Sequence, residues 1–474
     1  MTDAAERGFF SRHAKIYPRI VDGRFARLRA GALVATLGVL LFTPWLKWGD
    51  RQAVWQDFPH RKFHLFGLVF WPQDLIYLTA LLVIAALFLF LVTALAGRVW
   101  CGYACPQTVF TQIFVWIERA FEGDRAEQLR LSRHGWTAGR LFRLVGKGFF
   151  WALAALGTAV SAVGYFVPIR ELVPALFAGT APLLAYIALI VVTAAILLFA
   201  GRMREQVCIY MCPYARFQSA MFDRDTLIIS YDTKRGEPRG ALSRDEAAAS
   251  RALGSCIDCS LCVQVCPTGI DIRNGLQYQC IACASCIDAC DEVMDRVGAP
   301  RGLVRYTTFD ALEGHPTRLG RPRIFAYGGL ILALVAALSY AIAHRVPLEF
   351  DVLRDRNATY REVGDGRIEN VYRLKVLNMD QVAHQYALDV SGPDEIAVVY
   401  KPEELLVGAG ENRDLAIRVR VPPESLVTRS SGIDFRLASV DQPEIAVRKE
   451  SRFLGPAPRP GPEEGADEEK EEVQ

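Results

Sequence analysis

The sequence predicts an α-helical membrane protein with five transmembrane helices, a cysteine-rich domain inserted before the fifth, and a C-terminal all-β immunoglobulin-like sandwich. Three observations support this prediction. The 474 residues are 51% hydrophobic with a formal net charge of only +2, which is too apolar for an ordinary soluble protein. Five long apolar runs account for the excess. After the last run, apolar and polar residues alternate, as is typical of strands.

The chain begins with a basic arm, residues 1–29, which lacks the apolar core of a signal peptide. Each apolar run that follows is close to the length of about 20 residues that a helix needs to cross a bilayer, and each contains few or no charges. The runs lie at about 30–48, 75–97, 148–169, 181–201 and 325–343. We therefore expect four transmembrane helices within residues 30–201 and a fifth at 325–343.

Arginine and lysine are distributed unevenly between the connecting segments. Eight lie in residues 98–147 and sixteen in residues 202–324, whereas the opposite connections hold Arg51, Arg61, Lys62 and Arg170. Because basic loops remain on the cytoplasmic side, the N-terminus and residues 202–324 are predicted to be cytoplasmic and the C-terminal region to lie outside. All 12 cysteines would then lie on the reducing side, which argues against a disulfide framework.

The inserted segment contains two consecutive Cys-x2-Cys-x2-Cys-x3-Cys motifs, CIDCSLCVQVCP and CIACASCIDACD. In two-cluster ferredoxins, the last cysteine of each motif serves the other 4Fe-4S cluster. By this rule one cluster is held by Cys256, Cys259, Cys262 and Cys290, and the other by Cys280, Cys283, Cys286 and Cys266. Zinc is the alternative, but four-cysteine zinc sites do not need this reciprocal spacing. Residues 202–324 are thus predicted to form a cytoplasmic two-cluster ferredoxin-like domain that transfers single electrons.

Two shorter cysteine motifs follow the second and fourth apolar runs, in AGRVWCGYACPQTVF and AGRMREQVCIYMCPYARF. Each gives Gly-Arg and then Cys-x3-Cys-Pro, so the two hairpins form an internal repeat. Cysteines at i and i+4 lie on one face of a helix, and the repeat predicts a four-thiol site formed by Cys101, Cys105, Cys208 and Cys212. Thiolates favour Cu(I), zinc or iron–sulfur clusters over hard cations. The alternative is that these cysteines are small apolar residues buried at helix ends. The nearby Arg98, Arg202 and Arg204 are interpreted as anchors to the membrane surface.

Residues 346–455 show the period-two alternation most clearly at 415–421 and 433–437. Comparable segments near 348–353, 371–377, 385–390, 396–400 and 445–453 bring the total to about seven short strands, which predicts an immunoglobulin-like sandwich without a disulfide. Such a domain acts either as a passive cap or as a docking module. The last residues, 456–474, are rich in proline, glycine and acidic side chains and are predicted to be disordered.

These motifs occur together with the segments FHLFGLVFWPQD, CIYMCPYARFQSAMFD and APRGLVRY. The combination resembles the CcoG family, also called FixG or RdxA, the cytochrome c oxidase accessory proteins, over nearly all of residues 15–455. The resemblance implies a bacterial inner-membrane protein that supports assembly of cbb3-type cytochrome c oxidase, with its C-terminal domain in the periplasm. It also implies reduction of Cu(II) to Cu(I), with a copper transporter or copper chaperone and the oxidase maturation machinery as partners.

The resulting hypothesis is a cupric reductase, an oxidoreductase in which a cytoplasmic donor loads the two clusters and Cu(II) is reduced near the four thiols. Two alternatives stay open. One is a quinol-linked electron-transfer subunit, and the other is an oxidase assembly scaffold with sensory clusters. The sequence contains no recognisable quinone pocket, nucleotide loop or flavin motif, so it does not identify the electron donor. The expected partner is the membrane, and no nucleic acid is expected.

Overall fold

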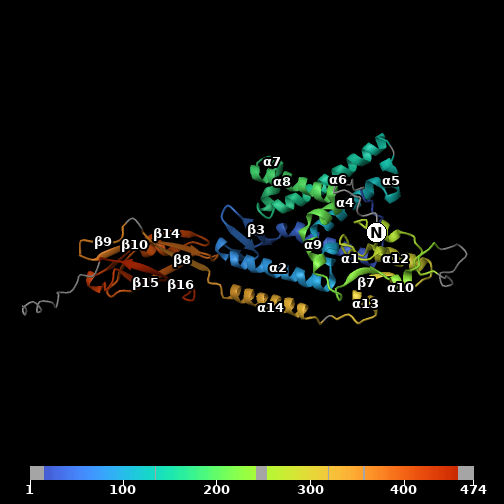
Figure 1. Cartoon of the computed structure of the whole chain (residues 1–474). Helices are drawn as coiled ribbons and strands as arrows, with labels where there is room; N and C mark the ends of the chain where they lie inside the picture. The colour runs from blue at the N-terminus through green and yellow to red at the C-terminus, as the bar shows by residue number, and fades with distance from the viewer. Residues whose placement is uncertain (1–14, 134, 242–252, 319, 356–357, 457–474) are drawn as a thin grey trace, which may run out of the picture. The chain divides into compact units, whose positions relative to one another are not determined.

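The computed structural model describes residues 15–133, 135–241, 253–318, 320–355 and 358–456, and the chain divides into two compact units (Figure 1). The first unit comprises Met1–Leu68 and Pro72–Leu338, and the second comprises Val69–Trp71 and Ser339–Gln474. The first part of the predicted basic arm and nearly all of the predicted disordered tail lie outside the described residues.

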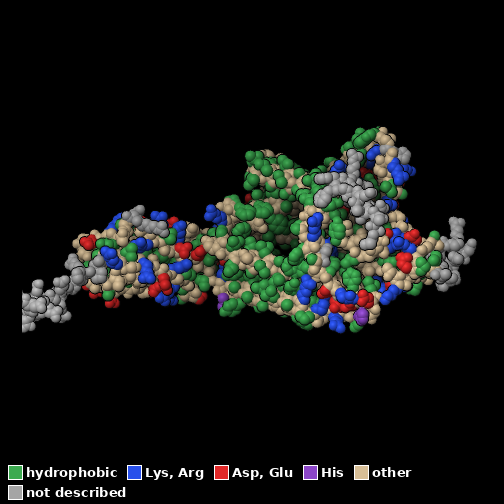
Figure 2. Space-filling view, in the orientation of Figure 1, with side chains coloured by type: hydrophobic (Ala, Val, Ile, Leu, Met, Phe, Trp, Pro, Cys, Tyr) green, Lys and Arg blue, Asp and Glu red, His purple; other side chains and the backbone are tan. Residues whose placement is uncertain are grey.

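Within the described residues, five helices are long and apolar enough to cross a bilayer, which confirms the predicted class of multi-pass membrane protein. They are α1 (Arg24–Phe42), α2 (Leu75–Ala96), α6 (Ala138–Val163), α8 (Leu183–Ile196), which continues in wider turns to Met203, and α14 (Pro322–Ala343). The most apolar stretches of α2 and α14 bury no residue, as expected of helices that face lipid. Hydrophobic side chains accordingly cover much of the visible helical surface in Figure 2.

The first helix begins at Arg24, six residues before the predicted start of the span. The carboxylate of Asp288 accepts hydrogen bonds from the backbone N–H groups of Phe25 at 3.1 Å and Ala26 at 2.8 Å. These bonds satisfy two of the N–H groups that the first turn of a helix leaves unpaired. A side chain more than 260 positions away in the sequence therefore caps this helix, and the apolar pattern alone could not place its start.

The third bilayer-length helix also differs from its predicted range of 148–169. It begins at Ala138, where the Thr137 hydroxyl accepts from the N–H of Arg140, and it ends at Val163. Its first turns carry basic residues, so the apolar count missed them. A separate helix, α7 (Ile169–Ala178), follows the turn.

The connection between α1 and α2 forms small antiparallel pairs of strands. They are β1 (Lys47–Trp48) with β2 (Arg51–Gln52), and β3 (Val54–Asp57) with β4 (Lys62–Leu65); β5 (Leu68–Phe70) follows. The Trp55 indole N–H donates to the carbonyl of Phe166 at 3.1 Å, and the Gln52 amide donates to that of Gly164 at 2.7 Å. These bonds hold the connection against the turn that follows α6.

The remainder of the first unit consists of short elements around the cysteine motifs. They are α3 (Val99–Tyr103), α4 (Pro106–Glu122), α5 (Arg125–Arg133), α9 (Pro213–Ala220), β6 (Ile228–Tyr231), α10 (Thr233–Gly236), α11 (Leu261–Gln264), α12 (Ser285–Arg296), β7 (Val304–Thr307) and α13 (Phe309–Glu313). β6 and β7 pair antiparallel and close the cysteine-rich segment at both ends. Its core includes Ile229, Ile287, Met294 and Leu303.

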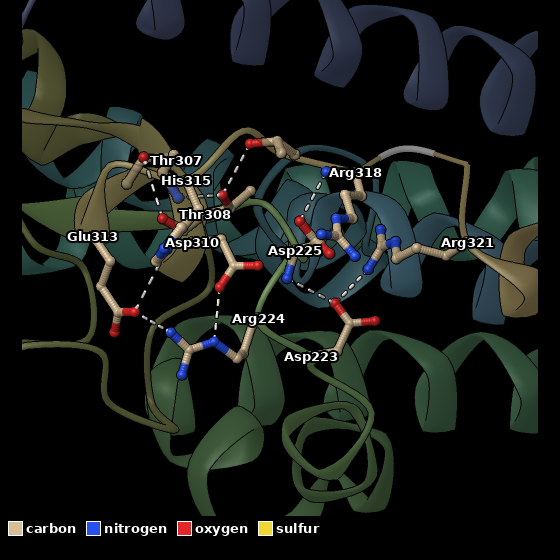
Figure 3. A network of polar contacts seen from close by, with 12 residues as sticks. Asp223, Arg224, Asp225, Thr307, Thr308, Asp310, Glu313, His315, Arg318 and Arg321 are labelled. Atoms are coloured by element: carbon tan, nitrogen blue, oxygen red, sulfur yellow. Dashed lines mark hydrogen bonds and ion pairs between the residues drawn. The ribbon is translucent and has the colours of Figure 1, made fainter.

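An ion-pair network joins the two ends of the cysteine-rich segment (Figure 3). Arg224 donates to Asp310 at 2.7 Å and also contacts Glu313. Arg321 contacts Asp223 and donates to the carbonyl of Ala94 at 3.0 Å, near the end of α2. The network therefore ties the chain entering α14 to the end of α2. His315 lies beside Glu313 and Asp310, but Arg224 engages both carboxylates, so this cluster is a structural contact.

The second unit contains the seven predicted strands in two antiparallel sheets, with two additional strands of two residues each. One sheet has the order β12-β14-β10-β8, with β9 beside β10, and the other has the order β13-β11-β15-β16. The strands are β8 (Leu348–Arg354), β9 (Arg361–Glu362), β10 (Ile368–Asn378), β11 (His384–Ser391), β12 (Ala397–Val399), β13 (Leu406–Val407), β14 (Asn412–Val421), β15 (Ser430–Ser439) and β16 (Ala446–Leu454). The inner faces share one core, which includes Phe350, Tyr372, Phe435 and Leu437.

Replacement of a core residue of this sandwich should destabilise it selectively. Leu437 is fully buried, so Leu437→Ala should cost about 2–5 kcal/mol through lost burial and the cavity left behind. Leu353 is 50% exposed, and Leu353→Ala should stay within about 0.5 kcal/mol. Pulse proteolysis of the full chain in increasing urea measures the difference. Equal midpoints for the two variants would contradict the assigned core.

Candidate functional site

The eight cysteines of the long motifs surround two small cavities. Cys256, Cys259, Cys262 and Cys290 line one cavity together with Tyr231 and Arg273. Cys266, Cys280, Cys283 and Cys286 line the other, which Cys262 also borders. Each set that the reciprocal spacing predicts is thus gathered around a cavity of its own, and the two cavities adjoin at Cys262.

Each motif bends through the left-handed backbone region at the second and fourth residues after its first cysteine. These residues are Asp258 and Ser260 in the first motif and Ala282 and Ala284 in the second, with φ of 53° to 60°. Non-glycine residues pay about 1–2 kcal/mol each for this conformation. Alternating right- and left-handed residues turn successive backbone N–H groups toward a common anion. Four cysteines and backbone N–H groups turned toward one point can hold a negatively charged iron–sulfur cluster with four thiolate ligands.

The short cysteine pairs lie where helices are broken. Cys101 belongs to α3, whereas Cys105 directly precedes α4, whose first residue is Pro106. Cys208 lies in the turn Val207–Met211, and Cys212 directly precedes α9. The prediction that each pair shares one face of a continuous helix is therefore wrong. Proline lacks an N–H group and fits the first position of a helix, so each proline starts a new helix after the second cysteine.

The two pairs lie near enough to each other to interact electrostatically. Burial raises the pKa of Cys101 to about 12, with further contributions from the neighbouring Cys105, Cys208 and Cys212. The Cys101 thiol donates to the side-chain carbonyl of Gln218 at 3.2 Å. We call these four cysteines the four-thiol group. A metal bound there would have to displace thiol protons.

Each repeat contacts the other through a glutamine. Gln218 of α9 donates to the Thr93 hydroxyl of α2 at 3.3 Å, next to its bond with Cys101. Gln107 of α4 donates to the carbonyls of Phe199 and Arg204 at 2.8 and 3.1 Å, in the broken segment after α8. Sequence reasoning missed both glutamines, although each follows its Cys-Pro within a few residues.

Arg98 and Arg204 are buried, with 4% and 6% of their surfaces exposed, so their prediction as membrane-surface anchors is wrong. Arg98 donates to the backbone carbonyls of Tyr278 and Cys280, the latter at 3.3 Å. It also lies near Cys101, Cys208 and Cys212, so that its charge would favour their deprotonated forms. Arg98 therefore lies between the four-thiol group and the loop of the second long motif.

That loop packs directly on the turn between Cys101 and Cys105. A Cβ atom on Gly102 would lie 2.7 Å from the carbonyl oxygen of Ile281 and 2.9 Å from the Cα of Cys283. From the other side, Arg29 of α1 donates to the carbonyl of Cys283 at 2.8 Å and contacts Ser285. The cysteine loop is thus held between α1 and the thiol-bearing turn.

A buried charge cluster fixes the second broken segment. Glu118 of α4 accepts from Arg204 at 2.7 Å and contacts Lys15 of the arm, while Lys147 of α6 contacts Glu122 and lies 3.6 Å from Glu118. Burial alone would raise the pKa of Glu118, but Arg204 and Lys15 hold that pKa at about 2. The carboxylate stays charged and links the arm, α4, α6 and the second cysteine pair.

Three family models match the chain. A 4Fe-4S binding domain matches residues 78–122 and a 4Fe-4S dicluster domain matches residues 203–309. The IG-like fold at the C-terminal of FixG matches residues 338–456. The two iron–sulfur matches together contain all 12 cysteines, including both short pairs.

Curated relatives match most of the chain. The nitrogen fixation protein FixG of Rhizobium meliloti is 38% identical over 421 residues, which are 81% of this chain and 80% of that protein. Proteins RdxA and RdxB of Cereibacter sphaeroides are 42% and 40% identical, over 80% and 84% of this chain and 82% and 86% of their own lengths. A crystal structure of a FixG-related protein from Vibrio parahaemolyticus is 32% identical, covers 23% of this chain and 95% of its own, and has a TM-score of 0.21.

A side chain at Gly102 should disturb the loop of the second motif. In Gly102→Ala the new methyl group meets backbone atoms, so the loop must shift at a cost of about 1–3 kcal/mol. We expect a changed electron paramagnetic resonance spectrum of the reduced protein, and a lower iron content. Gly157→Ala in α6 is the matched control, because nothing lies within 4 Å of its added atom. Identical spectra for both variants would refute the close packing.

Loss of the Glu118 charge should destabilise the first unit. Glu118→Gln leaves the buried Arg204 without its counter-charge, which costs about 3–5 kcal/mol. Glu313→Gln removes an arginine partner that is 54% exposed and should cost about 0–1 kcal/mol. The apparent melting temperatures of the two purified variants in detergent test this. If both variants lost a similar amount of melting temperature, the Glu118 cluster would contribute no more to stability than the exposed ion pair of Glu313.

Proposed function

Because the chain belongs to the FixG/RdxA family, we propose that it reduces Cu(II) to Cu(I) at the four-thiol group, for assembly of a cbb3-type cytochrome c oxidase. Its broader role is electron transfer by a multi-pass membrane iron–sulfur protein. The observation that carries the proposal is the packing of the Cys280–Cys283 loop on the turn between Cys101 and Cys105.

The residues that would hold the clusters are the two sets of four cysteines around the two cavities. When bound, the clusters supply one-electron transfer, which matches the one-electron change between Cu(II) and Cu(I). Gly102 permits the close approach of the second loop, and Arg98 fixes its backbone beside the four-thiol group. The set containing Cys280 is therefore the proximal one in the proposed electron route.

Copper is the substrate in this proposal. Soft thiolates stabilise Cu(I) relative to Cu(II), so binding at the four-thiol group favours the reduced product. The hydrogen bond from Cys101 to Gln218 orients one thiol of the first pair toward the second repeat. The distribution of arginine and lysine supports placing the cysteine sites at the cytoplasmic face of the bacterial inner membrane, with the sandwich in the periplasm. The proposed receivers of Cu(I) are a copper transporter or copper chaperone and the oxidase maturation machinery.

Removal of two thiols should uncouple copper reduction from the clusters. We expect anaerobically reduced protein to produce Cu(I), trapped by a Cu(I)-specific chelator, as the cluster absorbance reoxidises by one electron per copper. In the Cys101→Ser, Cys208→Ser variant, Cu(I) formation should fall at least about tenfold, since even outer partners of metal ligands have effects of that size.

The same variant provides its own control. Its cluster absorbance and its reoxidation by ferricyanide, which needs no thiol site, should match the wild type. Wild-type rates of Cu(I) formation in the variant would rule out the four-thiol group as the site. Reduced wild-type protein that ignores Cu(II) altogether would rule out copper as the acceptor.

A further inference from the structure

A cavity that the proposed copper chemistry does not use lies beside the cysteine loops. It is formed where the N-terminal arm, α1, α4 and the broken segment before Cys208 meet both long motifs. Cys283 and Cys208 both border it, so it touches the proximal cysteine set and the four-thiol group at once. A molecule bound there would lie next to the electron route.

The lining of this cavity is largely aliphatic with a few polar groups. Aliphatic side chains come from the arm, α1, α4 and the loops, including Val21, Leu33, Val109, Val115, Val265 and Ile281. Hydrogen-bonding groups come from Gln107, Thr111, Gln112 and Thr268, and the charged lining residues are Arg19, Arg29, Arg204 and Glu205. A mainly apolar lining with a few polar and charged groups is typical of sites for small organic molecules.

A second cavity adjoins the first beside a bilayer-length helix. The two share Ile20, Val21, Arg29 and Gln112 as lining residues. The second extends between Ala26 and Ala30 of α1 and Trp116 of α4. α1 is a bilayer-length helix and Trp116 is 41% exposed, which is typical of an aromatic residue at the membrane interface. Together these spaces, which we call the arm cavity, extend from the first turns of α1 to the Cys283 loop.

We propose that the arm cavity binds a membrane quinol and that this quinol is the electron donor of the protein. The quinol loses two electrons and two protons and becomes the quinone. The cluster that each four-cysteine set would hold would accept one of the electrons, and the protons would pass to water. This proposal deepens the proposed function, because it names the donor that serves the same electron route; one quinol would support reduction of two Cu(II) ions.

The charges beside the proximal set agree with a donor of this kind. Arg29 and Arg98 donate to the backbone carbonyls of Cys283 and Cys280. Two guanidinium groups at one loop stabilise the extra negative charge of the reduced state and therefore raise its reduction potential. A quinol is a mild reductant, so it needs an acceptor whose potential has been raised in this way.

Filling the arm cavity should block quinol but leave other electron donors unaffected. Thr111→Trp places an indole in the cavity, and Ala120→Trp, on an exposed position of the same helix, is the matched control. Cluster-loaded protein in detergent is mixed anaerobically, without copper, with a short-chain quinol or with dithionite. In Thr111→Trp, the quinol-driven bleaching of cluster absorbance should slow at least tenfold, equivalent to about 1.4 kcal/mol. Dithionite-driven bleaching should be unchanged, and Ala120→Trp should behave as wild type with both donors.

Direct binding gives a readout that does not depend on electron transfer. The oxidised protein in lipid nanodiscs should bind a short-chain quinone saturably in equilibrium dialysis, and Thr111→Trp should lose this binding.

If Thr111→Trp loses iron, Gln112→Leu, which keeps side-chain size but removes the amide, should raise the quinol concentration needed for half-maximal bleaching. Wild-type protein that dithionite bleaches but quinol does not would overturn the proposal, as would equal quinol rates in both tryptophan variants. Since the assay contains no copper, Cu(I) formation by dithionite-reduced protein remains a separate test of the proposed function.

Discussion

The close approach of the Ile281–Cys283 backbone to Gly102 is the contact on which the arrangement of the site depends. It brings a soluble-type cysteine motif against the end of a bilayer-length hairpin, with no side chain between them. Arg98 on one side and Arg29 on the other donate to carbonyls of the same loop. Because Arg29 belongs to α1 and Arg98 closely follows α2, the position of the loop is set by the bilayer-length helices.

The broken helices serve the same arrangement. A proline after each second cysteine ends one helical turn and starts another, which leaves backbone carbonyls without helical partners. Gln107 donates to two backbone carbonyls in the opposite repeat, and Gln218 connects the Cys101 thiol to Thr93. The two repeats therefore stabilise each other at the point where their thiols meet.

The buried charges explain why the arm belongs to the site. Glu118 contacts Lys15 of the arm and Arg204 of the second broken segment, and the arm continues along the cavity that reaches Cys283. A buried ion pair is a weak source of net stability, but removal of one partner is costly. The contact of Lys15 with the buried Glu118 therefore holds the arm beside the cavity. The basic residues of the arm thus do more than mark the cytoplasmic side of the membrane.

The amino-acid sequence by itself determined the elements whose signal is local: five apolar runs of bilayer length, seven alternating strands, and two cysteine motifs whose spacing groups eight thiols into two sets. It misplaced the start of α6 because basic residues in the first turns of that helix interrupt the apolar pattern. It misplaced the start of α1 and took Arg98 for a surface anchor, because the Asp288 cap and the Cys280 carbonyl are contributed by distant parts of the chain. Only the tertiary structure decided that the two short cysteine pairs meet and that a cavity opens beside Cys283. Local spacing decides which nearby residues lie in the same loop or helical turn. Contacts between loops that are far apart in the sequence leave no local pattern, so the sequence did not reveal them.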